Sequence, residues 1–157
     1  MNIVAITEDD WAALREIRLA ALADAPRAFG STVDRERAFG EERWREWTRR
    51  AQVFLGVVDG VPKAIAAGML EAGEVQLISV WAAPGARGTG LASATISAVI
   101  DWACAEGHPR VRTWVVEDNP TAARLYERLG FQTTGTRMPY PNDPTIDKIE
   151  LIRKLSP

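Results

Sequence analysis

The first third of the chain alternates between short apolar runs and stretches whose apolar residues recur at helical spacing. Residues 3–6 form a short apolar run that predicts a strand, and residues 7–26 predict a helix that ends at its proline. Residues 26–40 have no regular pattern and are expected to be irregular. A second helix is predicted over residues 41–50. The apolar face of the first helix consists of Leu14, Ile17, Ala21 and Leu22.

The middle of the chain has the pattern of strands joined by tight turns. The Asp-Gly pair at residues 59–60 is a strong two-residue hairpin signal between strands predicted over residues 53–58 and 63–70. The Ala-Gly pair at residues 72–73 makes the next turn and leads into a strand over residues 75–82. Three consecutive strands are therefore expected to pair with their neighbours in the sequence.

The second half of the chain changes to strands separated by helices. A helix follows the glycine-rich segment 84–90 and ends at residues 107–109. A strand at 111–116 and a helix from Asn119-Pro120 to Gly130 come next. The chain then continues with a strand at 131–137, a proline-rich loop at 138–144 and a strand at 146–155. Hairpins beside strand–helix–strand units predict one α/β domain over residues 1–157, with a mixed, largely antiparallel sheet of about seven strands flanked by about four helices.

Composition and charge narrow the class of protein. The 157 residues carry a net charge of −2, which provides no basic field for nucleic acid. A single cysteine, Cys104, excludes an intrachain disulfide and fits a reducing compartment. No apolar stretch reaches the roughly 18–20 residues that cross a bilayer, and the apolar run at residues 3–6 is too short for a signal peptide. We therefore expect a cytoplasmic protein with no nucleic-acid or membrane partner.

The segment Arg87-Gly88-Thr89-Gly90 lies between a predicted strand and a predicted helix. Glycines let the backbone approach a ligand, and a helix N-terminus presents unpaired N–H groups that suit a pyrophosphate. The segment lacks the Lys-Ser or Lys-Thr of a phosphate-binding P-loop, and Ser93 replaces the third glycine of a dinucleotide fingerprint. On these residues alone, a helix start without a ligand remains an open alternative.

A second motif lies downstream at Asn119, Ala122, Tyr126 and Gly130-Phe131. Together with the upstream segment 80–92, it resembles the two coenzyme-binding motifs of the GCN5-related N-acetyltransferase (GNAT) family, in the correct order and separated by one helix and one strand. The resemblance is sharp over residues 74–131 and extends to the whole chain through the order of its elements.

The resemblance implies that acetyl-CoA is the co-substrate, that no metal takes part, and that a homodimer is possible. It also implies a set of contacts with the coenzyme. The backbones of Val80, Trp81 and Ala82 would bind the pantetheine arm; the N–H groups of Arg87, Gly88, Thr89, Gly90, Leu91 and Ala92 would bind the pyrophosphate; Asn119 and Ala122 would lie beside the coenzyme; and Tyr126 would point at its sulfur.

The chemistry of acetyl transfer gives these residues roles. An amine, on a small molecule, a peptide N-terminus or a lysine, attacks the thioester carbonyl, and backbone donors at residues 80–82 can stabilise the oxyanion. The phenol of Tyr126 can protonate the thiolate as a general acid. For the base, Glu74 is the nearest acid, on the same strand face as Gln76, where some relatives carry glutamate. A non-catalytic acyl-CoA sensor and a transferase of longer acyl chains remain alternatives.

Several other residues have two interpretations. Cys104 has no activating neighbour, and the single histidine, His108, falls in a turn and cannot form a histidine-rich metal site. Trp44 and Trp47 either pack on the sheet or form a wall of the acceptor pocket. In the family, that pocket is shaped by the segments that correspond to residues 25–40 and 137–144. The acids in or near these segments, which could attract a cationic amine or be solvated, are Asp34, Glu36, Asp143 and Asp147.

Overall fold

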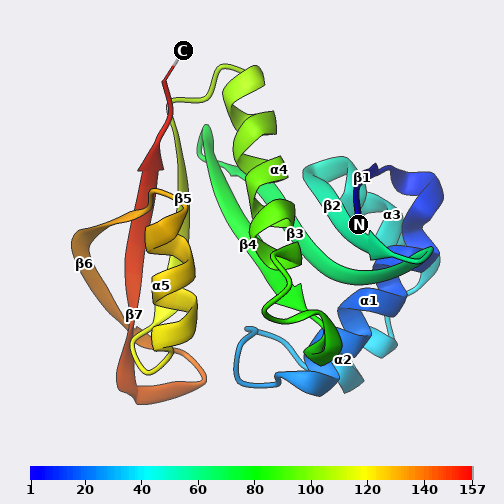
Figure 1. The fold of residues 1–157 in the computed structure, drawn as a ribbon. Coiled ribbons are helices and arrows are strands. Elements are labelled where there is room, and N and C mark those ends of the chain that lie inside the picture. The colour runs from blue at the N-terminus through cyan, green and yellow to red at the C-terminus, as the bar shows by residue number, and fades with distance from the viewer. Residues whose placement is uncertain (157) are drawn as a thin grey trace.

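In the computed structural model, which describes residues 1–156, seven strands form one sheet in the order β1-β2-β3-β4-β5-β7-β6 (Figure 1). Only β4 and β5 are parallel; all other neighbouring strands in the sheet are antiparallel. The sheet is therefore mixed and largely antiparallel, as predicted. Its strands are β1 (Asn2–Ile6), β2 (Ala51–Val58), β3 (Val61–Glu71), β4 (Glu74–Ala82), β5 (Arg110–Val116), β6 (Gln132–Tyr140) and β7 (Asp143–Lys154).

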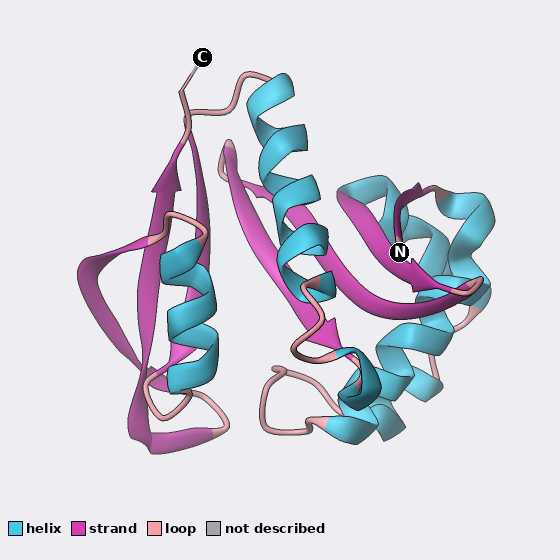
Figure 2. Ribbon diagram, viewed as in Figure 1, coloured by secondary structure: helices cyan, strands magenta, loops and turns pink. Residues whose placement is uncertain are grey.

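Helices cover both faces of this sheet (Figure 2). Successive residues of β3 point to opposite faces, so Ile65 and Ala67 pack with α1 and α3, whereas Ala66 packs with α4 and α5. Within residues 1–156, no helix is both long and apolar enough to cross a membrane. The helices are α1 (Trp11–Asp24), α2 (Val33–Arg37), α3 (Glu41–Arg50), α4 (Leu91–Ala105) and α5 (Pro120–Arg128), with short 3-10 turns η1 (Glu8–Asp10) and η2 (Pro84–Ala86).

The local signals for turns and helix starts are confirmed. Asp59 and Gly60 both have positive φ angles, of 51° and 76°, as a tight hairpin between β2 and β3 requires. Helix α3 has the predicted bounds. The side chain of Asn119 caps α5 by accepting a hydrogen bond from the backbone N–H of Ala122 at 3.1 Å.

Two predictions about the connections are wrong. The stretch 26–40 is not wholly irregular, because Thr32 caps the short helix α2, which brings the number of α-helices among the described residues to five. The proline-rich segment 138–144 is not a loop, because β6 continues to Tyr140 and β7 begins at Asp143. Its prolines are tolerated because β6 is an edge strand and this end of β7 pairs only with β6.

Helix α4 packs directly on the backbone of two strands. A Cβ atom built on Gly56 would lie 2.8 Å from the side chain of Leu91, and one on Gly68 would lie 2.8 Å from Trp102. Both glycines therefore allow α4 to approach β2 and β3 more closely than any other residue would. Leu91, the first residue of α4, also packs in one cluster with Ala82, the last residue of β4. The start of α4 therefore lies beside the end of β4, next to the glycine-rich segment.

Candidate active site

Strands β4 and β5 separate after two residue pairs. Val75 pairs with Val111 and Gln76 with Arg112, and the ladder ends there. The next carbonyl of β4, that of Leu77, accepts a hydrogen bond from the side-chain hydroxyl of Thr113 at 3.1 Å. Beyond this point the edge of β4 that faces β5 has no strand partner, so its backbone groups can bind a ligand.

A cleft of about 380 Å³ opens where the two strands part. Its walls come from β3, β4, β5, α1, α3, α5 and the segment after α1, which brings residues far apart in the sequence to one place. The lining residues are Arg18, Ala28, Phe29, Gly30, Trp47, Met69, Gln76, Leu77, Ile78, Ser79, Val80, Thr113, Trp114 and Tyr126. The volume lies within the usual range of small-molecule sites, about 300–1,000 Å³.

The wall formed by β4 is bent by a bulge. The pairing of β3 with β4 shifts register between Ile65 and Ala67, and Ser79 on β4 has a φ angle of 57°, which is unusual for a residue with a side chain. The hydroxyl of Ser79 accepts a hydrogen bond from the guanidinium of Arg18 on α1 at 3.2 Å. The bulge is thus tied to the opposite wall of the cleft.

Tyr126 is held in the cleft by packing against Phe131, which follows the end of α5. It is buried on the α4–α5 side of the core, and its ring meets that of Phe131 edge-on with centroids 5.4 Å apart. Burial raises the pKa of the Tyr126 phenol to about 12, against a smaller opposing effect of the Thr113 hydroxyl. The phenol is therefore neutral at physiological pH and retains a proton that it can donate.

The glycine-rich segment has the backbone geometry of an anion site. Gly88 and Gly90 have φ angles of 77° and 87°, and Gly90 precedes the first residue of α4. Among residues 1–156, the backbone N–H groups of Gly88, Thr89, Gly90 and Ala92 donate no hydrogen bond to the protein. Donors that are left unpaired at the start of a fifteen-residue helix suit a pyrophosphate, so this observation supports the fit of coenzyme A.

The side chain of Arg87 is held by the protein itself. Its guanidinium donates to the carbonyl of Ala82 at 3.1 Å and to the carboxylate of Asp24, which also accepts a hydrogen bond from the indole of Trp81 at 2.9 Å. The hydrogen bond from Trp81, followed by the hydrogen bond and charge of Arg87, lowers the pKa of Asp24. Asp24 was not identified from the sequence, and it joins the end of α1 to the end of β4 and to the glycine-rich segment.

The structure does not bring Glu74 to the cleft. Glu74 begins β4 at the end where β4 and β5 are still paired. It accepts hydrogen bonds from Arg110, and the guanidinium of Arg112 lies 2.8 Å away. The hydrogen bond from Arg110 and the two positive charges lower the pKa of Glu74, which makes it a weaker base. Its strand neighbour Gln76 does line the cleft, but Gln76 cannot accept a proton at neutral pH.

The four acids near the acceptor segments are paired with arginines. Glu36 is buried against Arg18, Asp143 lies 3.5 Å from Arg27, and Asp147 lies 3.0 Å from Arg137. Asp34 lies 3.7 Å from Arg37 and is fully exposed. None of the four lines the Tyr126 cleft, so the interpretation that they attract a cationic amine gains no support from their positions.

Arg18 is the main site residue that the sequence analysis missed. It lies on the same face of α1 as Leu14 and Leu22, and only 8% of its surface is exposed. Its guanidinium also stacks on Phe29 and Trp47, at 4.8 Å and 5.1 Å from the ring centroids. The available signal was a single charge at helical spacing within an apolar stripe, which indicates a buried partner.

The two interpretations of the α3 tryptophans are compatible. Trp44 is 1% exposed and packs in the core with Leu14 and Ile65, while Trp47 lines the cleft beside Arg18. The thiol of Cys104 is exposed. His108 lies just after the turn that ends α4, where its ring faces that of Trp102 at 6.0 Å.

The fold of this α/β domain is shared with other solved structures. The structure of an acetyltransferase of GNAT family from Streptococcus pneumoniae is similar over 99% of this chain and 99% of that one, with a TM-score of 0.84 and 18% identity. The structure of yncA from Salmonella typhimurium with its cofactor acetyl-CoA is similar over 100% of this chain and 95% of that one, with a TM-score of 0.78 and 23% identity. At these identities the likeness shows the fold.

The sequence comparisons give the family. The model of the Acetyltransferase (GNAT) family matches residues 11–131, and the chain therefore belongs to that family. Mycothiol acetyltransferase from Renibacterium salmoninarum is 30% identical over 136 residues, which are 80% of this chain and 38% of that protein. The enzyme of that name from Streptomyces avermitilis is 33% identical over 135 residues, which are 83% of this chain and 42% of that protein. The chain thus spans less than half the length of these two relatives.

Proposed function

We propose that the chain transfers the acetyl group of acetyl-CoA to a primary amine by direct attack, with Tyr126 as the general acid. The observation that carries this proposal is a neutral, buried phenol that lines the cleft where β4 and β5 part. Family membership supports acetyl-CoA as the co-substrate, and the unpaired N–H groups at Gly88–Gly90 suit its pyrophosphate. The bound coenzyme supplies the thioester.

The proton and electron balance of the reaction requires one acid and one base. The amine forms a C–N bond as the C–S bond of the thioester breaks, and Tyr126 gives its proton to the departing thiolate. The unpaired backbone edge of β4 beyond Leu77 provides donors for the developing oxyanion. Tyr126 regains a proton from solvent after each turnover.

Within residues 1–156, no side chain of the cleft is placed to take a proton from the acceptor amine. Among the described residues that line the cleft, none is Asp, Glu or His, and Glu36 is held by Arg18 just outside it. We therefore propose that the amine loses its first proton to water before attack, and its second to water afterwards. This assignment replaces Glu74, because two arginines hold its carboxylate away from the cleft.

The test is the substitution Tyr126→Phe, which removes one hydroxyl and keeps the ring. We expect the rate of a single turnover to fall by about 100-fold or more, as the loss of a general acid predicts. The affinity for acetyl-CoA, measured by calorimetry, should change little because the pyrophosphate donors are untouched. Thiol release with a panel of amines would report turnover.

The matched control is Tyr140→Phe, which removes a second buried tyrosine hydroxyl. Tyr140 donates its hydrogen bond to the backbone of Arg27 and does not line the cleft, so we expect a loss of stability with single-turnover chemistry retained. Equal rates for Tyr126→Phe and the native protein would exclude the general-acid role. Binding of acetyl-CoA without turnover of any amine would instead favour the acyl-CoA sensor.

A further inference from the structure

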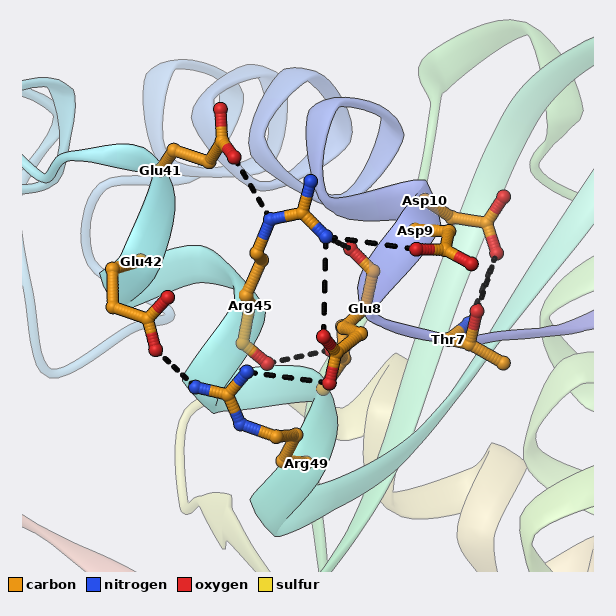
Figure 3. A network of polar contacts seen from close by, with 9 residues as sticks. Thr7, Glu8, Asp9, Asp10, Glu41, Glu42, Arg45 and Arg49 are labelled. Atoms are coloured by element: carbon orange, nitrogen blue, oxygen red, sulfur yellow. Dashed lines mark hydrogen bonds and ion pairs between the residues drawn. The ribbon is translucent and has the colours of Figure 1, made fainter.

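Helix α3 carries four arginines that fall on two faces. Arg45 and Arg49 lie one turn apart and are surrounded by carboxylates from η1 and the start of α3 (Figure 3). Arg45 lies 2.9 Å from Glu41, and Arg49 lies 3.2 Å from Glu8 and also pairs with Glu42. These two charges are thus neutralised, and they hold α3 against the start of α1.

The other face of α3 points to a second cavity. Arg43, Trp47 and Arg50 recur at the i, i+4, i+7 spacing of one helical face, and all three line this cavity. The guanidinium of Arg43 stacks on Phe39 at 4.2 Å from the ring centroid. Neither Arg43 nor Arg50 has a carboxylate oxygen within 4.0 Å among residues 1–156. Their charges therefore remain available to a ligand.

The cavity has a volume of about 370 Å³ and an excess of positive charge. Arg18 and Glu36 neutralise each other within it, which leaves three arginines and one carboxylate, that of Glu46. The full lining is Arg18, Gly30, Ser31, Arg35, Glu36, Phe39, Arg43, Trp44, Glu46, Trp47, Arg50 and Met69. Guanidinium groups without partners beside aromatic rings suit an anion attached to an apolar body.

Trp44 adds a large aromatic side chain to the lining of the same cavity. Trp44 is 1% exposed, and its indole Nε1 has no hydrogen-bond partner among residues 1–156. A buried donor without a partner is rare in folded proteins. Because this nitrogen is closed off from solvent, it offers no contact to a ligand in the cavity.

This cavity adjoins the Tyr126 cleft. Four residues line both: Arg18, Gly30, Trp47 and Met69. A molecule that reached across them would place one end beside the arginines of α3 and the other in the cleft. We propose that the acceptor is a primary amine that carries an anionic group, a carboxylate or a phosphate, on an apolar or aromatic body. This inference rests on the proposed acetyl transfer and adds the chemical class of the acceptor.

The experiment compares three probes that share one benzylic primary amine: p-aminomethylbenzoate, p-aminomethylphenyl phosphate and p-aminomethylbenzamide, whose amide group carries no charge. Binding to the protein saturated with coenzyme A is measured by calorimetry, and acetylation by thiol release with acetyl-CoA. We expect at least one anionic probe to bind and react about 10- to 100-fold better than the amide, as hydrogen bonds to charged groups predict. The better of the two anions identifies carboxylate or phosphate.

Substitutions of single arginines test which side chains cause the preference for an anionic probe. Arg43→Gln and Arg50→Gln should each remove most of the preference for the anionic probe and leave the amide unchanged, while Arg43→Lys should keep part of it. Arg37→Gln makes the same change of charge on an exposed residue of α2 outside the cavity and should have no effect. Equal use of anionic and neutral probes, or an anion preference that survives both glutamine variants, would overturn the inference with acetyl transfer intact. Failure to bind acetyl-CoA would overturn the proposed function itself.

Discussion

Arg18 and Glu36 form a buried ion pair that joins α1 to α2 at the edge of the candidate active site. The guanidinium donates to both carboxylate oxygens of Glu36, at 2.9 Å and 3.1 Å, and a further nitrogen donates to Ser79 on the bulge of β4. One side chain therefore fixes three elements around the cleft. The arrangement explains how a segment with little regular pattern, residues 26–40, is held in place.

Removing one partner of this pair should be costly. Glu36→Gln leaves the Arg18 charge buried, and we expect a loss of about 3–5 kcal/mol in the free energy of unfolding. The double variant Arg18→Met, Glu36→Leu should recover much of that loss, because it removes both charges. Urea unfolding measures both values, and Asp34→Asn on the same helix, which is fully exposed, serves as the control. A loss below about 1 kcal/mol, as for a surface pair, would contradict the buried-pair interpretation.

The same pair predicts the pH dependence of stability. Burial alone would raise the pKa of Glu36, but the hydrogen bonds from Arg18 and Ser31 and the nearby positive charges outweigh it and lower the pKa. A carboxyl with a lowered folded-state pKa contributes fully above its unfolded pKa of about 4.3, and this contribution is lost as pH falls through the folded value. The native protein should therefore lose more stability on acidification than Glu36→Gln does.

The raised pKa of Tyr126 predicts the shape of the pH–rate profile. A phenol with a pKa of about 12 keeps its proton throughout the working range, so its ionisation should give no fall in rate below about pH 10. With no carboxylate on the cleft wall to take the amine proton, kcat/KM should rise with pH up to the pKa of the acceptor amine itself, near 10 for an alkylamine. The profile is measured with two amines of different pKa. An ascending limb at the same pH for both would reveal a base on the protein.

Two glycines of the glycine-rich segment 84–90 make a matched pair of test sites for the proposed binding of coenzyme A. Gly90 has a φ angle of 87°, whereas Gly85 does not have a positive φ; a Cβ atom would meet nothing within 4 Å at either. Gly90→Ala should therefore strain the start of α4 by about 1–3 kcal/mol and weaken coenzyme A binding by about tenfold, while Gly85→Ala should do neither. Calorimetry with coenzyme A and urea unfolding give the two readings. Equal effects at both positions would show that backbone conformation is not what Gly90 provides.

Much of the architecture follows from local signals. The Asp59-Gly60 turn, the helix over residues 41–50 and the Asn119 cap depend on interactions within a few residues, and all three are found in the structure. The proline-rich segment 138–144 was misjudged, because proline is tolerated in a strand only where its neighbour is absent. That condition depends on the order of strands in the sheet and is not visible in the local sequence.

The sequence by itself determined the family and most of the order of the elements, because these depend on contiguous motifs and local patterns. Only the tertiary structure decided the charge of the cavity beside α3. Whether an arginine is neutralised, as Arg45 is, or left available, as Arg43 is, depends on which carboxylates from other elements lie within about 4 Å of it. Glu74 is a second example. Its position in the sequence suggested the cleft, but ion pairs with Arg110 and Arg112 hold its carboxylate outside it.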